Sequence, residues 1–128
     1  MAVERIQPDG LASPPTYSHV VKAGNTIYIA GQVSQDEQGQ LVGAGDFVAQ
    51  ANQVFENLGK ALASAGASFR DLVKTNVYVT DPRYREQLRD VRNTYLDSAT
   101  LPTSTLVVVA GLALPEYLLE IEAVAVVE

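Results

Sequence analysis

The alternation of apolar and polar positions is clearest in the segment 117–127, near the end of the chain. With the two-residue period of a β-strand, one face of this segment is entirely apolar and carries Leu119, Ile121, Ala123, Ala125 and Val127. The other face carries Glu120 and Glu122 among further apolar residues. Burying an ionised carboxylate is costly unless it is paired or hydrogen-bonded. The second face is therefore expected to line a polar cleft, a subunit interface or an exposed sheet face.

The rest of the pattern predicts four more strands and two helices, in the overall order β-β-α-β-α-β-β. Residues 1–15 are expected to be an irregular lead-in, because they contain three prolines and a glycine. Strands are predicted over 17–22, 26–33, 73–80, 103–110 and 117–127. In the segment 73–80, Val73, Thr75, Val77 and Val79 are predicted to share one face.

The two helices are predicted from caps and apolar stripes. The first spans 46–64, with Asp46 as N-cap, Gly66 as the C-terminal stop and a stripe of Phe47, Ala51, Val54, Leu58 and Leu62. The second starts at Asp81–Pro82, ends near 96–98 and buries Tyr84, Leu88, Val91 and Tyr95. Two such helices can cover one face of a mixed sheet, so residues 1–128 are predicted to form a single α+β domain, a two-layer sandwich.

Composition narrows the possible functions. A chain of 128 residues with 47% hydrophobic and 19% charged residues is typical of a folded domain. No apolar run is long enough to span a membrane, and the N-terminus lacks the pattern of a secretory signal, so a cytoplasmic protein is expected. The chain has no cysteine and His19 is its only histidine, so neither a disulfide nor a multi-histidine metal site is expected within one chain. No metal or other cofactor is predicted.

The net charge of −6 argues against nucleic acid as a partner, because nucleic-acid binders usually carry a basic excess. Basic residues are concentrated only in the second predicted helix, at Arg83, Arg85, Arg89 and Arg92. They are interleaved with Glu86 and Asp90. This alternation is typical of a solvated helix face with salt bridges.

Several short motifs resemble the RidA (YjgF) family. They are Pro–Thr–Ser–Thr at 102–105, Leu–Pro at 114–115, Leu–Glu–Ile–Glu–Ala at 119–123, Pro–Thr–Tyr–Ser at 15–18 and Ala–Gly–Gln at 30–32. The resemblance implies a chorismate-mutase-like fold and a homotrimer in which small molecules bind in three clefts between subunits. Proteins of the family are described as reactive-intermediate deaminases, endoribonucleases or translation inhibitors. The acidic composition gives the ribonuclease description no support.

The resemblance also assigns candidate site residues. Glu120 would position the water that attacks an imine, and Tyr17, at the start of the first strand, would line the cleft. Gly31 would let the backbone approach the ligand, while Ala30 stands where many deaminases have a hydroxyl residue. The alternatives are an interfacial carboxylate for Glu120, core packing for Tyr17 and a β-bulge for Gly31. Glu122 is expected to be structural.

One position departs from the family pattern. Ser104 replaces the arginine that would hold a substrate carboxylate through two parallel N–H bonds, and a serine cannot form that fork. Leu106 follows two residues later and would also face the substrate. Arg92 aligns with a cleft-facing asparagine of the deaminases and could supply a guanidinium from another direction. The alternative is an ordinary surface arginine.

Two functional classes remain open. One is a RidA-type hydrolase or deaminase acting on an imine, an enamine or a related metabolite, although not on the usual 2-iminocarboxylates. The other is a non-catalytic trimer that binds a small metabolite.

Overall fold

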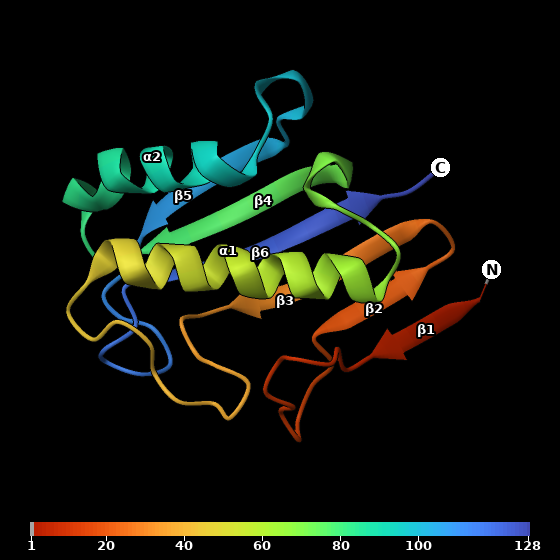
Figure 1. Cartoon of the computed structure of the whole chain (residues 1–128), viewed down its shortest axis with the longest axis horizontal. Coiled ribbons are helices and arrows are strands. Elements are labelled where there is room, and N and C mark those ends of the chain that lie inside the picture. Colours follow the sequence, from red (N-terminus) through yellow and green to blue (C-terminus); the bar gives the residue numbers. More distant parts are fainter. Residues whose placement is uncertain (1) are drawn as a thin grey trace.

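The computed structural model describes residues 2–128 as a six-stranded mixed sheet with two α-helices on one face (Figure 1). The strands are β1 Val3–Ile6, β2 Val20–Ala23, β3 Thr26–Gln32, β4 Leu72–Val79, β5 Thr103–Val108 and β6 Leu119–Val126. The helices are α1 Phe47–Ser64 and α2 Arg85–Tyr95. The predicted two-layer α+β sandwich and the predicted order of elements are confirmed. The prediction of an irregular lead-in over 1–15 is wrong for Val3–Ile6, which form β1 because they pair with β2.

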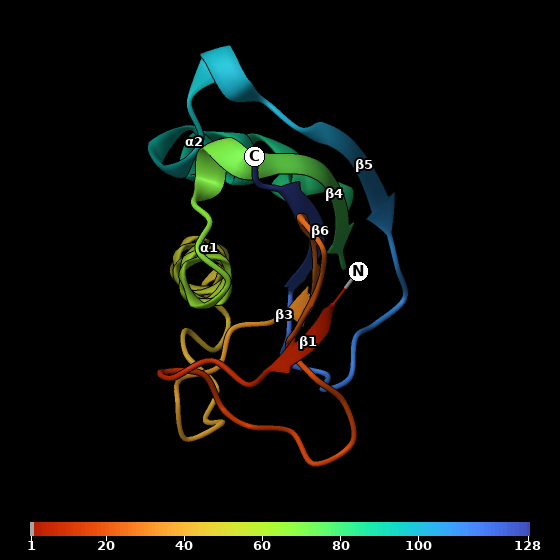
Figure 2. The ribbon, with the colours of Figure 1, turned by 90° about the vertical axis from the view of Figure 1, so that its right-hand side faces the viewer.

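The strand order in the sheet is β1-β2-β3-β6-β4-β5. Strand β6 therefore lies in the interior of the sheet, although it comes last in the chain. All neighbouring strands are antiparallel except β4 and β5, which are parallel and joined through α2. Figure 2 shows α1 on one side of the curved sheet and β5 at its outer edge.

Helix α1 forms where its caps predict. The carboxylate of Asp46 accepts a hydrogen bond from the backbone N–H of Ala49 at 3.0 Å, and Gly66 follows the helix with a φ of +78°. All five residues of the predicted stripe are buried against the sheet. Each fully buried Val or Leu side chain contributes about 1.5–3 kcal/mol to stability, so this stripe fixes the helix on the sheet.

The apolar face of β6 forms the matching surface. Its core-facing residues are buried beneath the helices, and they are Leu119, Ile121, Ala123 and Ala125. The residues between them are partly exposed on the opposite face. The entirely apolar face predicted for the segment 117–127 is therefore the face that packs on the helices. Glu120 and Glu122 lie on the opposite, uncovered face of the sheet.

Two details of the predicted strands are wrong. Strand β2 begins at Val20, so Tyr17 lies in the preceding loop and is 50% exposed. The backbone of this loop bonds to a side chain, since the amide of Gln7 donates to the carbonyl of Tyr17 at 2.8 Å. In β4, a register shift between Leu72 and Lys74 buries Leu72 and leaves Val73 exposed.

Helix α2 is preceded by the predicted Asp81–Pro82 start, which forms a short 3-10 turn over Pro82–Tyr84. Asp81 also pairs with Arg83 at 2.6 Å, and the hydrogen bonds from Arg83 lower the pKa of Asp81 to about 2. This is the only ion pair within residues 2–128. The salt bridges predicted for the helix face are therefore absent, because Glu86 and Asp90 pair with none of its arginines. In the described part of the chain, no helix is long and apolar enough to cross a membrane.

Candidate functional site

The uncovered face of β6 carries two carboxylates with different surroundings. Glu122 accepts hydrogen bonds from the hydroxyl of Tyr78 at 2.6 Å and from the amide of Asn76 at 3.1 Å. Both donors come from β4, the neighbouring strand, and the bond to Glu122 raises the pKa of Tyr78. Glu122 is therefore fixed as an acceptor that ties β4 to β6, in agreement with its predicted structural role.

Glu120 has no such partners. It is half-buried, and no residue of the described chain donates a hydrogen bond to its carboxylate. Burial raises the pKa of Glu120, and the nearby charge of Glu122 raises it further. A raised pKa makes the carboxylate of Glu120 a stronger base than an ordinary glutamate, which favours acid–base chemistry.

Gly31 supports Glu120 directly. The pairing of β3 with β6 is irregular between Ile29 and Gln32, so Gly31 lies in a β-bulge. A Cβ atom at this position would lie only 2.7 Å from Cδ of Glu120 and would collide with its Oε2. The predicted alternative of a β-bulge at Gly31 is therefore confirmed, and the carboxylate of Glu120 packs against Gly31. The approach of a ligand to this backbone stays a prediction.

Tyr17 belongs to a loop that is anchored on a buried histidine. The ring of Tyr17 meets His19 edge-on, with centroids 5.8 Å apart. Nε2 of His19 donates to the carbonyl of Ala12 at 2.6 Å, because Nδ1 accepts from the amide of Gln32 at 3.1 Å. Burial raises the pKa of Tyr117, and the phenol of Tyr17 adds to the effect.

Ala30 lies beside this loop, where its N–H donates to the carbonyl of His19 at 2.8 Å. It lines a cavity of about 330 Å³ on the uncovered sheet face, together with Asn76 and Glu122. Contacts link Tyr17 and Ala30 to His19, and Gly31 to Glu120, and among these residues only Ala30 lines the cavity. The five residues are called the acidic half-site below.

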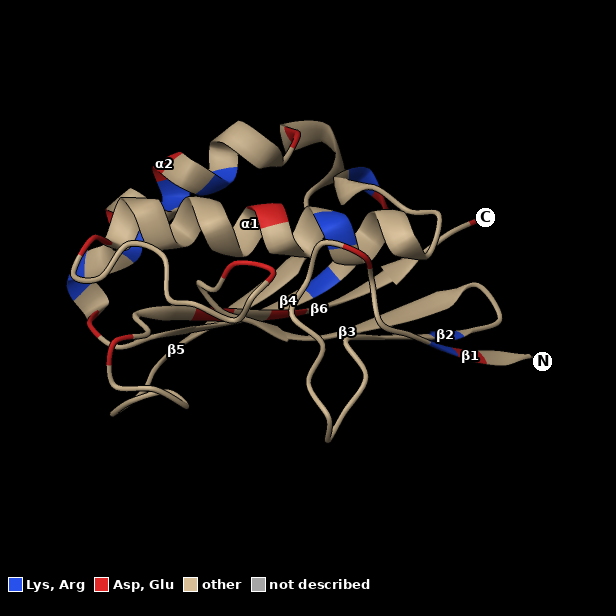
Figure 3. Cartoon of the chain, turned by 60° about the horizontal axis from the view of Figure 1, so that its bottom comes forward, with Lys and Arg blue, Asp and Glu red and all other residues tan. Residues whose placement is uncertain are grey.

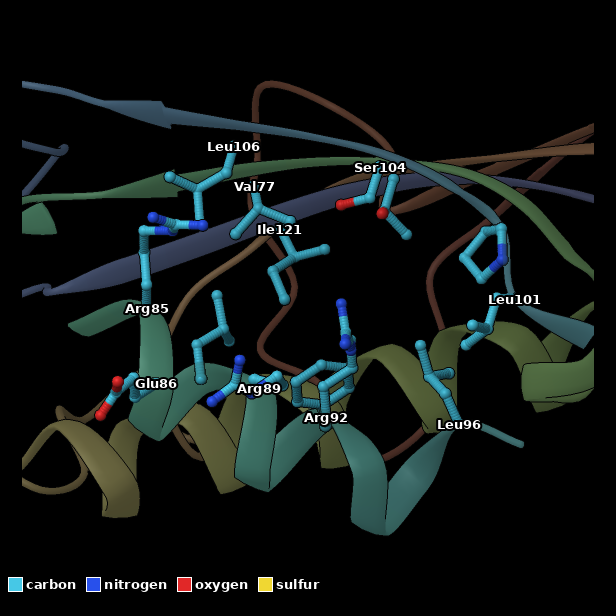
Figure 4. Close-up of a pocket in the computed structure, with 14 residues that line it drawn as sticks. Val77, Arg85, Glu86, Arg89, Arg92, Leu96, Leu101, Ser104, Leu106 and Ile121 are labelled. Atoms are coloured by element: carbon cyan, nitrogen blue, oxygen red, sulfur yellow. The ribbon is translucent and has the colours of Figure 1, made fainter. Parts of the chain in front are cut away.

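A larger cavity, of about 480 Å³, lies between α2 and strands β4 and β5. It contains the remaining three predicted residues, Arg92, Ser104 and Leu106 (Figure 4). Two more arginines that were not assigned to the site from sequence, Arg85 and Arg89, also line it. Their spacing of four and three residues up to Arg92 places all three on one side of the helix, a signal that was available in the sequence. This group is called the basic half-site below.

The two half-sites lie on opposite faces of the sheet. On β6, Ile121 lines the cavity beneath α2, whereas the preceding residue, Glu120, points to the uncovered face. Figure 3 shows the basic positions of α2 above the sheet and acidic positions on the sheet itself. One chain therefore does not bring Glu120 and Arg92 into a single pocket. Within residues 2–128 there is also no group of three His, Asp or Glu side chains that could hold a metal ion.

The structure is a small α+β sandwich with a cavity on each face of its sheet. A sequence model described as Endoribonuclease L-PSP matches residues 9–127. The chain is 41% identical over 111 residues to the 2-iminobutanoate/2-iminopropanoate deaminase of Mus musculus, a match that covers 86% of this chain and 80% of that protein. It is 35% identical over 111 residues to the RutC family protein slr0709 of Synechocystis, covering 86% and 85% of the two chains.

Solved structures agree with these relatives. RidA from an Antarctic Psychrobacter superposes with a TM-score of 0.89 at 38% identity, over 97% of this chain and 99% of that one. TdcF of E. coli with bound serine superposes with a TM-score of 0.86 at 29% identity, over 97% and 98%. The chain belongs to the endoribonuclease L-PSP family, that is, the RidA (YjgF) family. The resemblance predicted from the sequence motifs is confirmed.

Proposed function

We propose that this protein is a cofactor-independent deaminase of the RidA type, which hydrolyses an imine or enamine metabolite in clefts between three identical subunits in the cytoplasm. The observation that carries the proposal is the state of Glu120, a half-buried carboxylate with a raised pKa that rests on Gly31 and has no partner in its own chain. An unpartnered carboxylate of this kind destabilises a fold, so a functional role accounts for it better than a structural one.

The chemistry follows from the position of Glu120. Its carboxylate accepts a proton from water as the water oxygen attacks the carbon of the C=N bond. Glu120 returns this proton to the nitrogen, which gives a neutral carbinolamine. The carbinolamine hydroxyl then transfers its proton to the nitrogen through Glu120, the C–N bond breaks, and ammonia leaves as the C=O group forms. An enamine enters the same route after protonation on carbon, which converts it to the imine. Tyr17, on its exposed loop, would orient the substrate.

The division of the site between two faces supports an assembly. If the acidic half-site of one copy covers the basic half-site of the next, the contact joins two different surfaces, and such contacts close into rings. The exposed apolar residues near β5 are suited to burial in this contact, and they are Leu106, Val107, Val108 and Leu114. Because the resemblance to the RidA family implies a homotrimer, we propose a ring of three copies of this chain. Light scattering that gives a stable monomer at micromolar concentration would overturn the shared cleft.

The substrate is expected to differ from 2-iminopropionate and 2-iminobutyrate. Ser104 offers one short hydroxyl where a two-pronged guanidinium would hold the carboxylate, and losing a charge-assisted pair costs about 1.5–3 kcal/mol. Arg92, in the same cavity, offers a guanidinium from α2 instead. The cavity therefore suits a substrate whose anionic group lies closer to the helix than to β5.

The test is a panel of imines generated from different amino acids by an amino-acid oxidase, with release of ammonia and of the 2-oxo acid as readouts. The parent protein is expected to accelerate hydrolysis of at least one imine, and Glu120→Gln to reduce that rate by about 100-fold or more. A cleft that binds 2-oxo acids without accelerating any imine would instead establish the alternative, a metabolite-binding trimer.

A further inference from the structure

Helix α2 directs three guanidinium groups toward one cavity. Arg85, Arg89 and Arg92 all line the space between α2 and the strands β4 and β5. Figure 4 shows the guanidinium of Arg92 extending from the helix toward the strand that carries Ser104. Figure 4 also shows the carboxylate of Glu86, the one acidic side chain of the lining, pointing away from the cavity.

These positive charges are not neutralised within the chain. Among residues 2–128 the only ion pair joins Arg83 and Asp81, and no carboxylate lies within ion-pair distance of the three cavity arginines. Nε of Arg92 is buried and has no hydrogen-bond partner. A buried donor without a partner costs about 1–3 kcal/mol, and the like charges of neighbouring guanidinium groups add to the cost. A bound anion would remove both costs at once.

Most of the remaining lining is apolar. Leu88, Leu101, Leu106 and Ile121 face the same cavity, together with the hydroxyl residues Thr75 and Ser104, so apolar surface lies beside the three arginines. A single small anion would leave this apolar surface and two of the three arginines unused. The helix rises about 4.5 Å between Arg89 and Arg92 and about 10 Å between Arg85 and Arg92. Two anionic groups on one short carbon chain fit this arrangement.

We propose that the basic half-site binds a small dicarboxylate. One carboxylate binds Arg92 beside Ser104, and the second binds Arg89, with Arg85 at the open end. The inference rests on the proposed function, because it makes the reacting molecule an imino acid that carries a second carboxylate. It also explains why the arginine usually supplied by β5 is dispensable: the anion is bound by α2.

Isothermal titration calorimetry tests the proposal with the 2-oxo acids that correspond to the hydrolysis products. The parent protein should bind 2-oxoglutarate or 2-oxoadipate at least tenfold more tightly than 2-oxobutyrate. Arg89→Gln should remove this preference and leave the affinity for 2-oxobutyrate within about twofold. Arg92→Gln should weaken the binding of all three acids at least tenfold.

Arg83→Gln is the matched control, because it removes one positive charge next to the same helix without touching the cavity. Its affinities should equal those of the parent. Equal affinity of the parent for mono- and dicarboxylates overturns the proposal, and so does an equal loss of preference in Arg83→Gln and Arg89→Gln. If dicarboxylates bind as expected while no imine is hydrolysed, the proposed deaminase function fails and the binding site stands. If imines are hydrolysed without any dicarboxylate preference, the binding site fails and the function stands.

Discussion

Replacing Gly31 by alanine changes the candidate site by one methyl group. The new Cβ atom would lie 2.7 Å from Cδ of Glu120, whereas ordinary contact begins at 3.4 Å, so the carboxyl group must retreat by at least about 0.7 Å. The three atoms nearest the new Cβ all belong to the end of the Glu120 side chain, which is flexible. The substitution therefore displaces the proposed base and little else.

The effects on stability and activity should differ sharply. Gly31 does not have a positive φ, so alanine fits the backbone and offers about 0.4–1 kcal/mol of stabilisation through the unfolded chain. We expect a net change in unfolding free energy of less than about 1 kcal/mol. A displacement near 1 Å of a catalytic group costs about 100-fold in rate, which corresponds to about 2.7 kcal/mol in the barrier.

Steady-state hydrolysis of an accepted imine and thermal unfolding measure the two quantities on the same preparations. Gly111→Ala is the control, because a Cβ atom there meets nothing within 4 Å, and it should leave both unchanged. The double variant Gly31→Ala/Glu120→Gln should be no slower than Glu120→Gln alone, since both changes act through one carboxylate. Parental turnover in a folded Gly31→Ala protein would refute the role of Glu120 and the positioning role of Gly31.

Three further predictions concern Ser104 and the two carboxylates. Ser104→Arg should leave the rate of 2-iminobutyrate hydrolysis more than tenfold below that of the mouse deaminase, a difference of about 1.4 kcal/mol in the barrier. The reason is that Arg92 already occupies the same cavity and repels a second guanidinium. Recovery to within tenfold in steady-state assays would contradict this prediction. Glu122→Gln should shift the acidic limb of the pH profile of kcat/KM to lower pH. Burial raises the pKa of Glu120, and the charge of Glu122, which the substitution removes, raises it further. If the acidic limb does not move, another group determines it. Glu120→Gln should raise Tm at pH 7, by an amount that becomes smaller toward pH 4. If differential scanning calorimetry gives a lower Tm at pH 7, the carboxylate of Glu120 is not an unpartnered, destabilising group.

Local signals in the sequence were sufficient to predict the two helices and to predict which residues of β6 share a face. The Asp46 cap, the stripe of α1 and the Asp81–Pro82 start each depend on residues close together in the chain, so the structure reproduces them. Strand β1 has no comparable signal. Its residues Val3–Ile6 are mostly exposed, and the strand exists because it pairs with β2. Pairing of this kind is a tertiary interaction that no local pattern encodes.

The candidate site shows the same limit. The motifs selected Glu120, Gly31 and Ser104 by position, and the two-residue period of β6 placed Glu120 away from the helices. The division into two half-sites could not be predicted, because it depends on β5 pairing in parallel beside β4 and on α2 crossing above both. The sequence favoured salt bridges on the arginine-rich helix. The structure instead turns Arg85, Arg89 and Arg92 toward β5, where acidic partners are absent from the lining apart from Glu86.

The two carboxylates of β6 illustrate how one strand separates stability from chemistry. Glu122 accepts two hydrogen bonds from β4 and so helps to hold the two strands together. Glu120, in contrast, lowers the stability of the fold. Because its pKa is raised in the folded state, the fold binds its proton more tightly than the unfolded chain does, and stability falls as pH rises from the ordinary carboxyl range through the raised pKa. The same desolvation that lowers the stability of the fold above the raised pKa makes the carboxylate of Glu120 a stronger base. Burial in a cleft completed by a second subunit would increase both effects, so assembly would strengthen the proposed base while its contacts offset the loss of stability.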